Sequence, residues 1–240
     1  MFRMSITVDA LGLAAVKGLS WSSAPEVHLI HDGVVGDRHW SPVTPDLTCI
    51  RATDHPAMVG VSAGSVDLPG AEHVLFDGRP QTVRYYSRPV TARIFDGPLA
   101  HRVSVAAGQR LYLACAEGPG HFLWSSPVSV LLRSELEDLP HDVARYRANV
   151  VLDDRGQPLS MGVGTRLVMG EAVLEVEREL ERCVIINHHA RTGNRDASLL
   201  GRLRPGLLLG YGCAVVGPGG VNVGDSVRVL PGSLGLGSDR

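Results

Sequence analysis

The sequence predicts a mostly β fold of the α+β class, with one or two short helices. The first observation is a series of short alternating apolar runs, and the second is the placement of turn residues between them. The third is composition, because 28 glycines and 15 prolines accompany only 5% aromatic residues. A chain of 240 residues can form one large β domain or two smaller ones, and it can bury a core without disulfide bonds.

The first part of the chain is predicted to consist of short strands. Runs of strand-forming residues occur at residues 5–8, 26–30, 58–61, 83–86 and 93–95. Asp-Gly pairs at residues 32–33 and 77–78, and the sequence DGP at residues 96–98, are turn signals between these runs. This succession of short strand-forming runs and turn residues favours sheets connected by tight turns.

Two helices are predicted in the second part. Ser126 and Pro127 suit the cap and the first position of a helix, and apolar residues recur at helical spacing over residues 128–139. A shorter helix is predicted over residues 197–203, capped by Asp196.

Long strands are predicted nearer the C-terminus. Residues 174–182 alternate, with glutamates on one face and mainly leucine, valine and arginine on the other. By this parity Cys183 lies on the glutamate face, which is the more exposed one. Residues 207–216 and 226–230 are predicted as closing strands, with a turn at residues 217–220.

Charge and cysteine usage exclude several classes of protein. The net charge of −2 argues against a broad nucleic-acid-binding surface. The four cysteines are far apart and form no CxxC pair, so neither a zinc ribbon nor an iron–sulfur cluster is expected. The first residues lack the pattern of a signal peptide, and no apolar run is long enough to span a membrane. We therefore expect a cytoplasmic protein with reduced thiols.

Cys183 is the cysteine with the best chemical setting, because it directly follows Arg182. The thiolate is the form of cysteine that reacts and that binds soft metals, and a neighbouring guanidinium favours it. The alternative is a half-buried structural cysteine, since a free cysteine usually behaves as a small apolar residue. Cys49, Cys115 and Cys213 lie in apolar or turn contexts and are interpreted as structural.

Several segments, taken in order, resemble one known family. They are VKG at residues 16–18, GVVGDRHW at 33–40, TCIR at 48–51, SSPV at 125–128, RYRANVV at 145–151, RC at 182–183 and GVNVGDSV at 220–227. Together they resemble a MOSC-domain protein with the β-barrel domain that often precedes MOSC. The chain is similar to the amidoxime-reducing members of that superfamily. The resemblance covers nearly the whole chain.

The resemblance implies a fold and a cofactor. It implies a MOSC β-barrel at residues 91–236, packed against an N-terminal β-barrel-like domain at residues 1–90. It also implies a molybdenum–pyranopterin cofactor between them, with Cys183 as the protein ligand to molybdenum. The residues implied to hold the pterin and its phosphate are Lys17, Arg38, Arg51, Ser126, Arg147, Asn149 and Arg182. Arginine forks and a helix N-terminus are indeed the groups that bind phosphate in proteins.

The implied activity is the reduction of N-oxygenated small molecules by oxygen-atom transfer to molybdenum. The electrons are expected from a separate ferredoxin, flavoprotein or cytochrome, and no nucleic acid or membrane partner is expected. The segment after the cysteine departs from the family pattern TTVDPxTG, because Ile186 and Asn187 replace small hydroxyl residues and His189 replaces an acid. His188 or His189 is therefore a candidate proton donor, since the unperturbed pKa of histidine lies near neutrality.

Other interpretations remain open from the residues alone. Cys183 can instead carry a persulfide for sulfur transfer, or the protein can be a non-catalytic carrier of the cofactor. The two histidines suggest zinc only weakly, because neighbouring strand positions point to opposite faces. An exposed turn lysine is the ordinary interpretation of Lys17, and a surface ion pair is that of Arg38 with Asp37.

Overall fold

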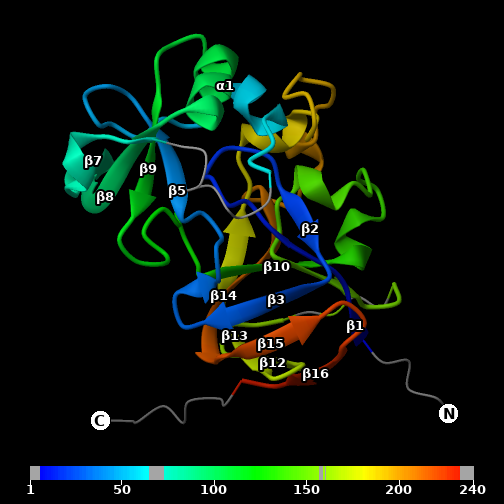
Figure 1. Cartoon of the computed structure of the whole chain (residues 1–240). Coiled ribbons are helices and arrows are strands. Elements are labelled where there is room, and N and C mark those ends of the chain that lie inside the picture. The colour runs from blue at the N-terminus through cyan, green and yellow to red at the C-terminus, as the bar shows by residue number, and fades with distance from the viewer. Residues whose placement is uncertain (1–5, 65–72, 157–158, 160, 233–240) are drawn as a thin grey trace, which may run out of the picture.

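A closed barrel forms the centre of the fold (Figure 1). The computed structural model describes residues 6–64, 73–156, 159 and 161–232. Within these residues seven strands follow one another around the barrel in the order β11, β10, β14, β13, β12, β16 and β1, and β1 pairs with β11 to close it. The strands are β1 (Ile6–Leu13), β10 (Val128–Leu132), β11 (Val150–Asp153), β12 (Arg166–Met169), β13 (Ala172–Glu181), β14 (Leu208–Gly217) and β16 (Ser226–Leu230). The predicted β-rich fold class is confirmed.

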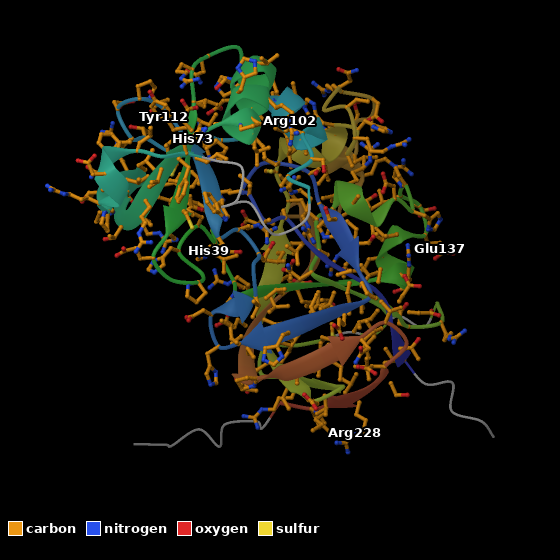
Figure 2. All side chains as sticks on the ribbon, in the orientation of Figure 1. His39, His73, Arg102, Tyr112, Glu137 and Arg228 are labelled. Atoms are coloured by element: carbon orange, nitrogen blue, oxygen red, sulfur yellow. The ribbon has the colours of Figure 1, made fainter. Side chains whose placement is uncertain are left out.

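Two smaller sheets flank the barrel. One consists of β15 (Gly219–Asn222), β3 (Glu26–Ile30) and β4 (Gly33–Val34). The other consists of β5 (Trp40–Val43), β9 (Tyr112–Ala116), β8 (Arg88–Asp96), β6 (His73–Val74) and β7 (Gln81–Tyr85). A short strand, β2 (Ser22–Ala24), pairs with β1. Figure 1 shows the sheet of β5, β7, β8 and β9, together with α1 (Pro98–Ala107), at the opposite end of the molecule from β16. In Figure 2, His73 and Tyr112 mark that sheet and Arg228 marks β16.

Alternating apolar side chains fill the barrel. Val8, Val130 and Leu174 come from three different strands and are at most 1% exposed. A strand in a closed barrel has no free edge, so its backbone groups pair while one set of side chains packs inward. The second sheet packs α1 and the interior side chains Leu113 and Trp40 into a separate cluster.

The predicted helix at residues 126–139 is wrong. Residues 128–132 form β10, and a single 3-10 turn at Arg133–Leu136 follows. β10 lies between β14 and β11 and is buried on both faces, so its apolar residues run nearly without a break. Such a run cannot be distinguished from a buried helix by periodicity alone.

Other elements also differ from the prediction. Residues 58–61 were expected as a strand, but the chain forms a 3-10 turn at Pro56–Gly60. The DGP sequence opens α1, because Pro98 occupies the first turn of the helix. The helix expected at residues 197–203 is reduced to a 3-10 turn at Leu200–Arg202. The expected turn at residues 217–220 instead leads directly into β15, which pairs with β3.

The division of the chain at residue 90 stays a prediction. Strands from the two sides of residue 90 pair with each other, since β1 pairs with β11 and β16, and β5 pairs with β9. Among the described residues, no helix is long and apolar enough to cross a membrane.

Candidate functional site

Loops from the barrel and from the second sheet meet around a cavity of about 470 Å³. We call it the Cys183 cavity. Its lining residues are Lys17, Arg38, Arg51, Thr53, Tyr86, Leu123, Trp124, Ser125, Ser126, Ser129, Tyr146, Arg147, Asn149, Leu180, Glu181, Arg182, Cys183, Ile185 and Ile186. They include the predicted cofactor-binding residues and Cys183, and they do not include His188 or His189. Segments separated by more than 160 residues thus form one site.

Cys183 lies just beyond β13, at the start of a 3-10 turn formed by Val184–Asn187. Its side chain is exposed, as the sequence predicted. The simple alternation behind that prediction does not hold along β13, because its register with β14 shifts at several points, including one between Glu179 and Glu181. Exposure leaves the thiol accessible from the cavity.

Arg182 turns into the wall of the barrel. Its Nε donates to the carbonyl oxygen of Leu209 at 2.8 Å and its Nη1 donates to that of Tyr146 at 3.0 Å. Its Nη2 is buried without a hydrogen-bond partner among the described residues. Burial lowers the pKa of this guanidinium to about 10, while the negative charges of Glu135 and Cys183 oppose the change. An unpaired buried donor is costly, so a shift of this guanidinium that brought Nη2 to the cavity would let it donate to an anion.

Ser126 offers a second donor. Its Oγ is buried and has no hydrogen-bond partner among the described residues. It packs against the backbone of Gly212 in β14, where a built Cβ atom would lie only 2.3 Å from the Oγ. Gly210, with a φ of +78°, likewise leaves room for Arg182, since its Cβ would lie 3.0 Å from Nη2. The glycines of β14 therefore create the space that these two side chains occupy.

Arg38 and Arg147 form the most constrained part of the cavity. Both backbones are left-handed, with φ of 48° and 56°, a conformation that is uncommon for residues other than glycine. Arg38 forms an ion pair with buried Asp37, and Arg147 Nη1 donates to the carbonyl oxygen of Leu19. Burial, and secondarily the charge of Arg38, lower the pKa of Arg147 to about 10. The fold thus holds two guanidinium groups together at one point.

Lys17 is the single lysine of the chain, which otherwise uses arginine as its basic residue. It is half-buried rather than an exposed turn residue. Its Nζ lies 5.1 Å from the ring centroid of Tyr85 and 5.8 Å from that of Tyr86. Burial, and secondarily the charges of Arg38 and Arg147, lower its pKa to about 7. Its ammonium group is therefore poorly stabilised unless an anion joins it.

Groups of the protein take up the hydrogen-bonding capacity of the Asn149 side chain. Its Oδ1 accepts from the backbone N and the Oγ of Ser129, at 3.0 and 2.8 Å. Its Nδ2 donates to Asp37 at 3.1 Å and to the carbonyl oxygen of Gly12 at 3.4 Å. Because these four bonds use the whole amide, Asn149 positions Asp37, and through it Arg38. Arg51 lies at the exposed rim, in a two-pronged pair with Asp54.

The two histidines belong to a neighbouring loop. His188 Nδ1 lies 2.8 Å from the carbonyl oxygen of Gly193, and His189 Nδ1 accepts from the backbone N of Arg191 at 3.3 Å. Gly193 lies close to Pro56, since a built Cβ would approach its carbonyl oxygen to 2.3 Å. These contacts fold the loop against the turn at Pro56–Gly60, outside the cavity lining. The proposed role of His188 or His189 as proton donor gains no support from this placement.

Sequence reasoning missed three features of the cavity. Tyr86 and Trp124 line it, although neither carried a recognisable functional pattern. Asp37 is only 4% exposed and anchors the backbone N of Ala14 at 2.8 Å, which makes it a buried support rather than half of a surface ion pair. The signal for Tyr86 is its left-handed backbone in a tight hairpin, and this conformation cannot be recognised from the sequence alone.

Two further observations define the limits of the site. Among the described residues, no three His, Cys, Asp or Glu side chains are arranged to hold a metal ion by themselves. A second, more open depression of about 590 Å³ lies beside Trp21 and Arg191 and contains none of the predicted site residues. It is larger, but the exposed thiol and the cluster of cations belong to the Cys183 cavity.

Charge gives the cavity its chemical character. Five of its described lining residues are cationic, namely Lys17, Arg38, Arg51, Arg147 and Arg182. Glu181 carries the one carboxylate of that described lining. Confined cations with unpaired donors form a site for an anion with several oxygen atoms, such as a phosphate ester.

Comparison with solved structures gives remote similarities. The YuaD protein from Bacillus subtilis is 16% identical, with 95% of this chain and 97% of that chain covered and a TM-score of 0.48. The YiiM protein from Geobacillus stearothermophilus is 14% identical over 46% of this chain and 57% of that chain, with a TM-score of 0.34. A hypothetical protein is 11% identical over 94% and 67% of the respective chains, with a TM-score of 0.42.

No curated protein matches the chain. The family model of the MOSC domain matches residues 118–228, a segment that runs from the loop before β10 into β16 and includes Arg147 and Cys183. Residues 118–228 thus carry a match to the MOSC domain, a family associated with molybdenum-cofactor binding.

Proposed function

We propose that the chain binds a molybdenum–pyranopterin cofactor in the Cys183 cavity and uses it to reduce N-oxygenated small molecules. One observation carries the proposal: the exposed thiol of Cys183 shares a single cavity with five cationic side chains and with unpaired buried donors. Cofactor binding by the MOSC family supports it.

The residues present fit such a cofactor. Arg182 Nη2 and Ser126 Oγ have no hydrogen-bond partners among the described residues, and a change of side-chain conformation would let both donate to phosphate oxygens in the cavity. Lys17, Arg38 and Arg147 add positive charge that a phosphate ester would neutralise. The Cys183 thiolate is the soft ligand that molybdenum prefers. Asn149 holds this arrangement in place without needing to touch the cofactor.

When bound, the cofactor would supply the metal centre that accepts the oxygen atom and delivers two electrons. The net reaction takes an N-hydroxylated substrate, two protons and two electrons to the reduced nitrogen compound and water. The chain's residues hold the cofactor by its charged groups and leave the Cys183 side open to small molecules. Because the reaction consumes two electrons, the proposal includes a separate ferredoxin, flavoprotein or cytochrome in the cytoplasm.

The test uses protein purified from a host that makes the cofactor. We expect molybdenum and pterin in amounts stoichiometric with the chain, and turnover of an N-hydroxylated compound with an artificial electron donor. Cys183→Ser should lose molybdenum and turnover together. Cys115→Ser is the matched control, because Cys115 is a half-buried thiol in β9 outside the cavity lining.

Two outcomes would contradict the proposal and indicate a different function. Protein without molybdenum, but with a cyanide-labile sulfur on Cys183, would indicate sulfur transfer through a persulfide. Protein with the full cofactor, but with no turnover of any N-oxygenated compound, would indicate a carrier of the cofactor.

A further inference from the structure

Two aromatic side chains stand at the rim of the Cys183 cavity, where Lys17 Nζ lies 5.8 Å from the ring centroid of Tyr86. Trp124 is 68% exposed and Tyr86 is 38% exposed, whereas Ser126 and Asn149 at the floor are at most 9% exposed. The ring centroids of the two aromatics are 4.2 Å apart and the planes are tilted by 47°. Contiguous exposed apolar side chains beside a cavity are a feature of ligand-binding grooves, whereas single scattered ones are ordinary.

The backbone holds Tyr86 in an uncommon conformation to place it there. Tyr86 follows β7 and, with Ser87, forms the two-residue turn to β8. Its φ is 53°, in a position of the hairpin that glycine, asparagine or aspartate normally fills. A bulky residue with left-handed backbone is strained, and such strain concentrates where side-chain placement serves a function.

The loop that carries Trp124 is fastened to the same hairpin. Arg88 Nη2, at the start of β8, donates to the carbonyl oxygens of His121 and Leu123 at 2.6 and 2.8 Å. The hydroxyl of Tyr85 donates to the carbonyl oxygen of Phe122 at 2.9 Å. These three bonds hold both aromatic residues on one rigid support, which reduces the entropy lost when a ligand binds.

The chemistry of the cavity divides between its floor and its rim. Buried and half-buried cations and unpaired donors lie toward the floor, while Tyr86, Trp124, Leu123 and Ile185 supply aromatic and apolar surface and Arg51 is the cation at the rim. The polar part suits the cofactor phosphate. The aromatic part offers stacking and apolar contact but few hydrogen-bond donors, so it suits a flat apolar ring.

We propose that Trp124 and Tyr86 form the substrate subsite and select N-oxygenated compounds whose reacting group is attached to a planar aromatic ring. The ring stacks on Trp124 and places the N-hydroxylated group toward Cys183. This inference deepens the proposed function and rests on it for the identity of the reacting group. The stacking itself requires only the rim residues.

Binding of a matched pair of compounds tests the subsite. Benzamidoxime and cyclohexanecarboxamidoxime carry the same reacting group on a flat and on a saturated ring. We expect the purified holoprotein to bind benzamidoxime about 3- to 10-fold more tightly, as measured by calorimetry. Trp124→Ala should abolish this preference and Trp124→Phe should keep most of it. Val163→Ala, at an exposed residue outside the cavity lining, should change neither affinity.

Equal affinity for the two compounds in the wild-type protein would overturn the proposal, as would an unchanged preference in Trp124→Ala. Calorimetry separates this failure from failure of the proposed function. A protein that contains molybdenum and reduces both compounds with equal KM keeps its function and loses the aromatic subsite. A protein without reductase activity that still prefers benzamidoxime through Trp124 keeps the subsite and loses the function.

Discussion

Arg38 and Arg147 meet inside the Cys183 cavity, where Arg38 Nη2 donates to the carbonyl oxygen of Arg147 at 3.4 Å across 109 residues of sequence. The contact joins the loop before β5 to the loop before β11, and it does so between two residues with left-handed backbones. Burial, and secondarily the like charge of Arg38, lower the pKa of Arg147 to about 10. The cavity is therefore built to be completed by an anion.

An anion should accordingly stabilise the cofactor-free protein. We expect pyrophosphate to raise Tm, because a ligand that binds only the folded state adds to its stability, and each kcal/mol is worth roughly 2–4 °C for a chain of this length. Arg147→Gln should lose most of this rise. Arg84→Gln is the matched control, since Arg84 is an exposed arginine paired with Asp46. The same rise with sodium chloride at equal ionic strength would argue against a specific site.

Lys17 should make the stability of the cofactor-free protein depend on pH. Its pKa falls from 10.5 to about 7 on folding, so the unfolded chain binds more protons between these values. The free energy of unfolding should therefore rise with pH above about 7, by at most ~1.4 kcal/mol per pH unit. Burial raises the pKa of the Cys49 and Cys115 thiols from 9.0 to about 11, so these thiols affect stability only near and above pH 9, and measurement between pH 7 and 8 avoids them.

Lys17→Met should flatten this slope and raise stability at pH 7, because it removes a poorly solvated charge. Since Lys17 is the single lysine, isotope-labelled lysine gives one side-chain amine resonance whose titration reports its pKa directly. A titration midpoint near the ordinary value of lysine would contradict the prediction, as would an unchanged slope in Lys17→Met.

Gly212 should be intolerant of a side chain because of Ser126. A Cβ at Gly212 would lie 2.3 Å from Ser126 Oγ and 2.8 Å from Ser126 Cβ. We expect Gly212→Ala to lower the free energy of unfolding by about 1–3 kcal/mol, the usual cost of overpacking. Adding Ser126→Gly should recover much of the loss, so the two changes would not be additive in chemical denaturation. Strict additivity would show that another neighbour causes the strain.

Asn149 should matter more for stability than its place in the cavity suggests. Asn149→Ala removes four hydrogen bonds, so the part-buried backbone N of Ser129 loses its bond to the amide. Among the described residues, buried Asp37 then keeps only its bonds to Arg38 and to the backbone N of Ala14. The expected loss is about 2–3 kcal/mol by urea denaturation. Asn194→Ala, at an exposed residue, should change stability by less than about 0.5 kcal/mol. A stable Asn149→Ala protein would mean that this network is not needed to position Asp37.

Local sequence was sufficient for the elements whose residues alternate. The strands β13, β14 and β16 were predicted correctly, because alternation of polar and apolar residues reflects a strand with one covered face. The exposure of Cys183 was also predicted, although the alternation behind that prediction is interrupted by the register shifts of β13. The residue types at the cavity were also predictable, since cations and a thiol in a family pattern need no coordinates to be recognised. What each residue does there stays a prediction.

Tertiary structure decided the rest. β10 is a strand because barrel neighbours bury both of its faces, and a continuous apolar run has no period that would distinguish it from a helix. The convergence of Lys17, Arg147 and Cys183 depends on strand pairings between distant segments. The place of His188 and His189 outside the cavity lining, like the hairpin that brings Tyr86 to its rim, depends on the three-dimensional path of the chain. Residue chemistry is local, but the distance between residues is set by the whole fold.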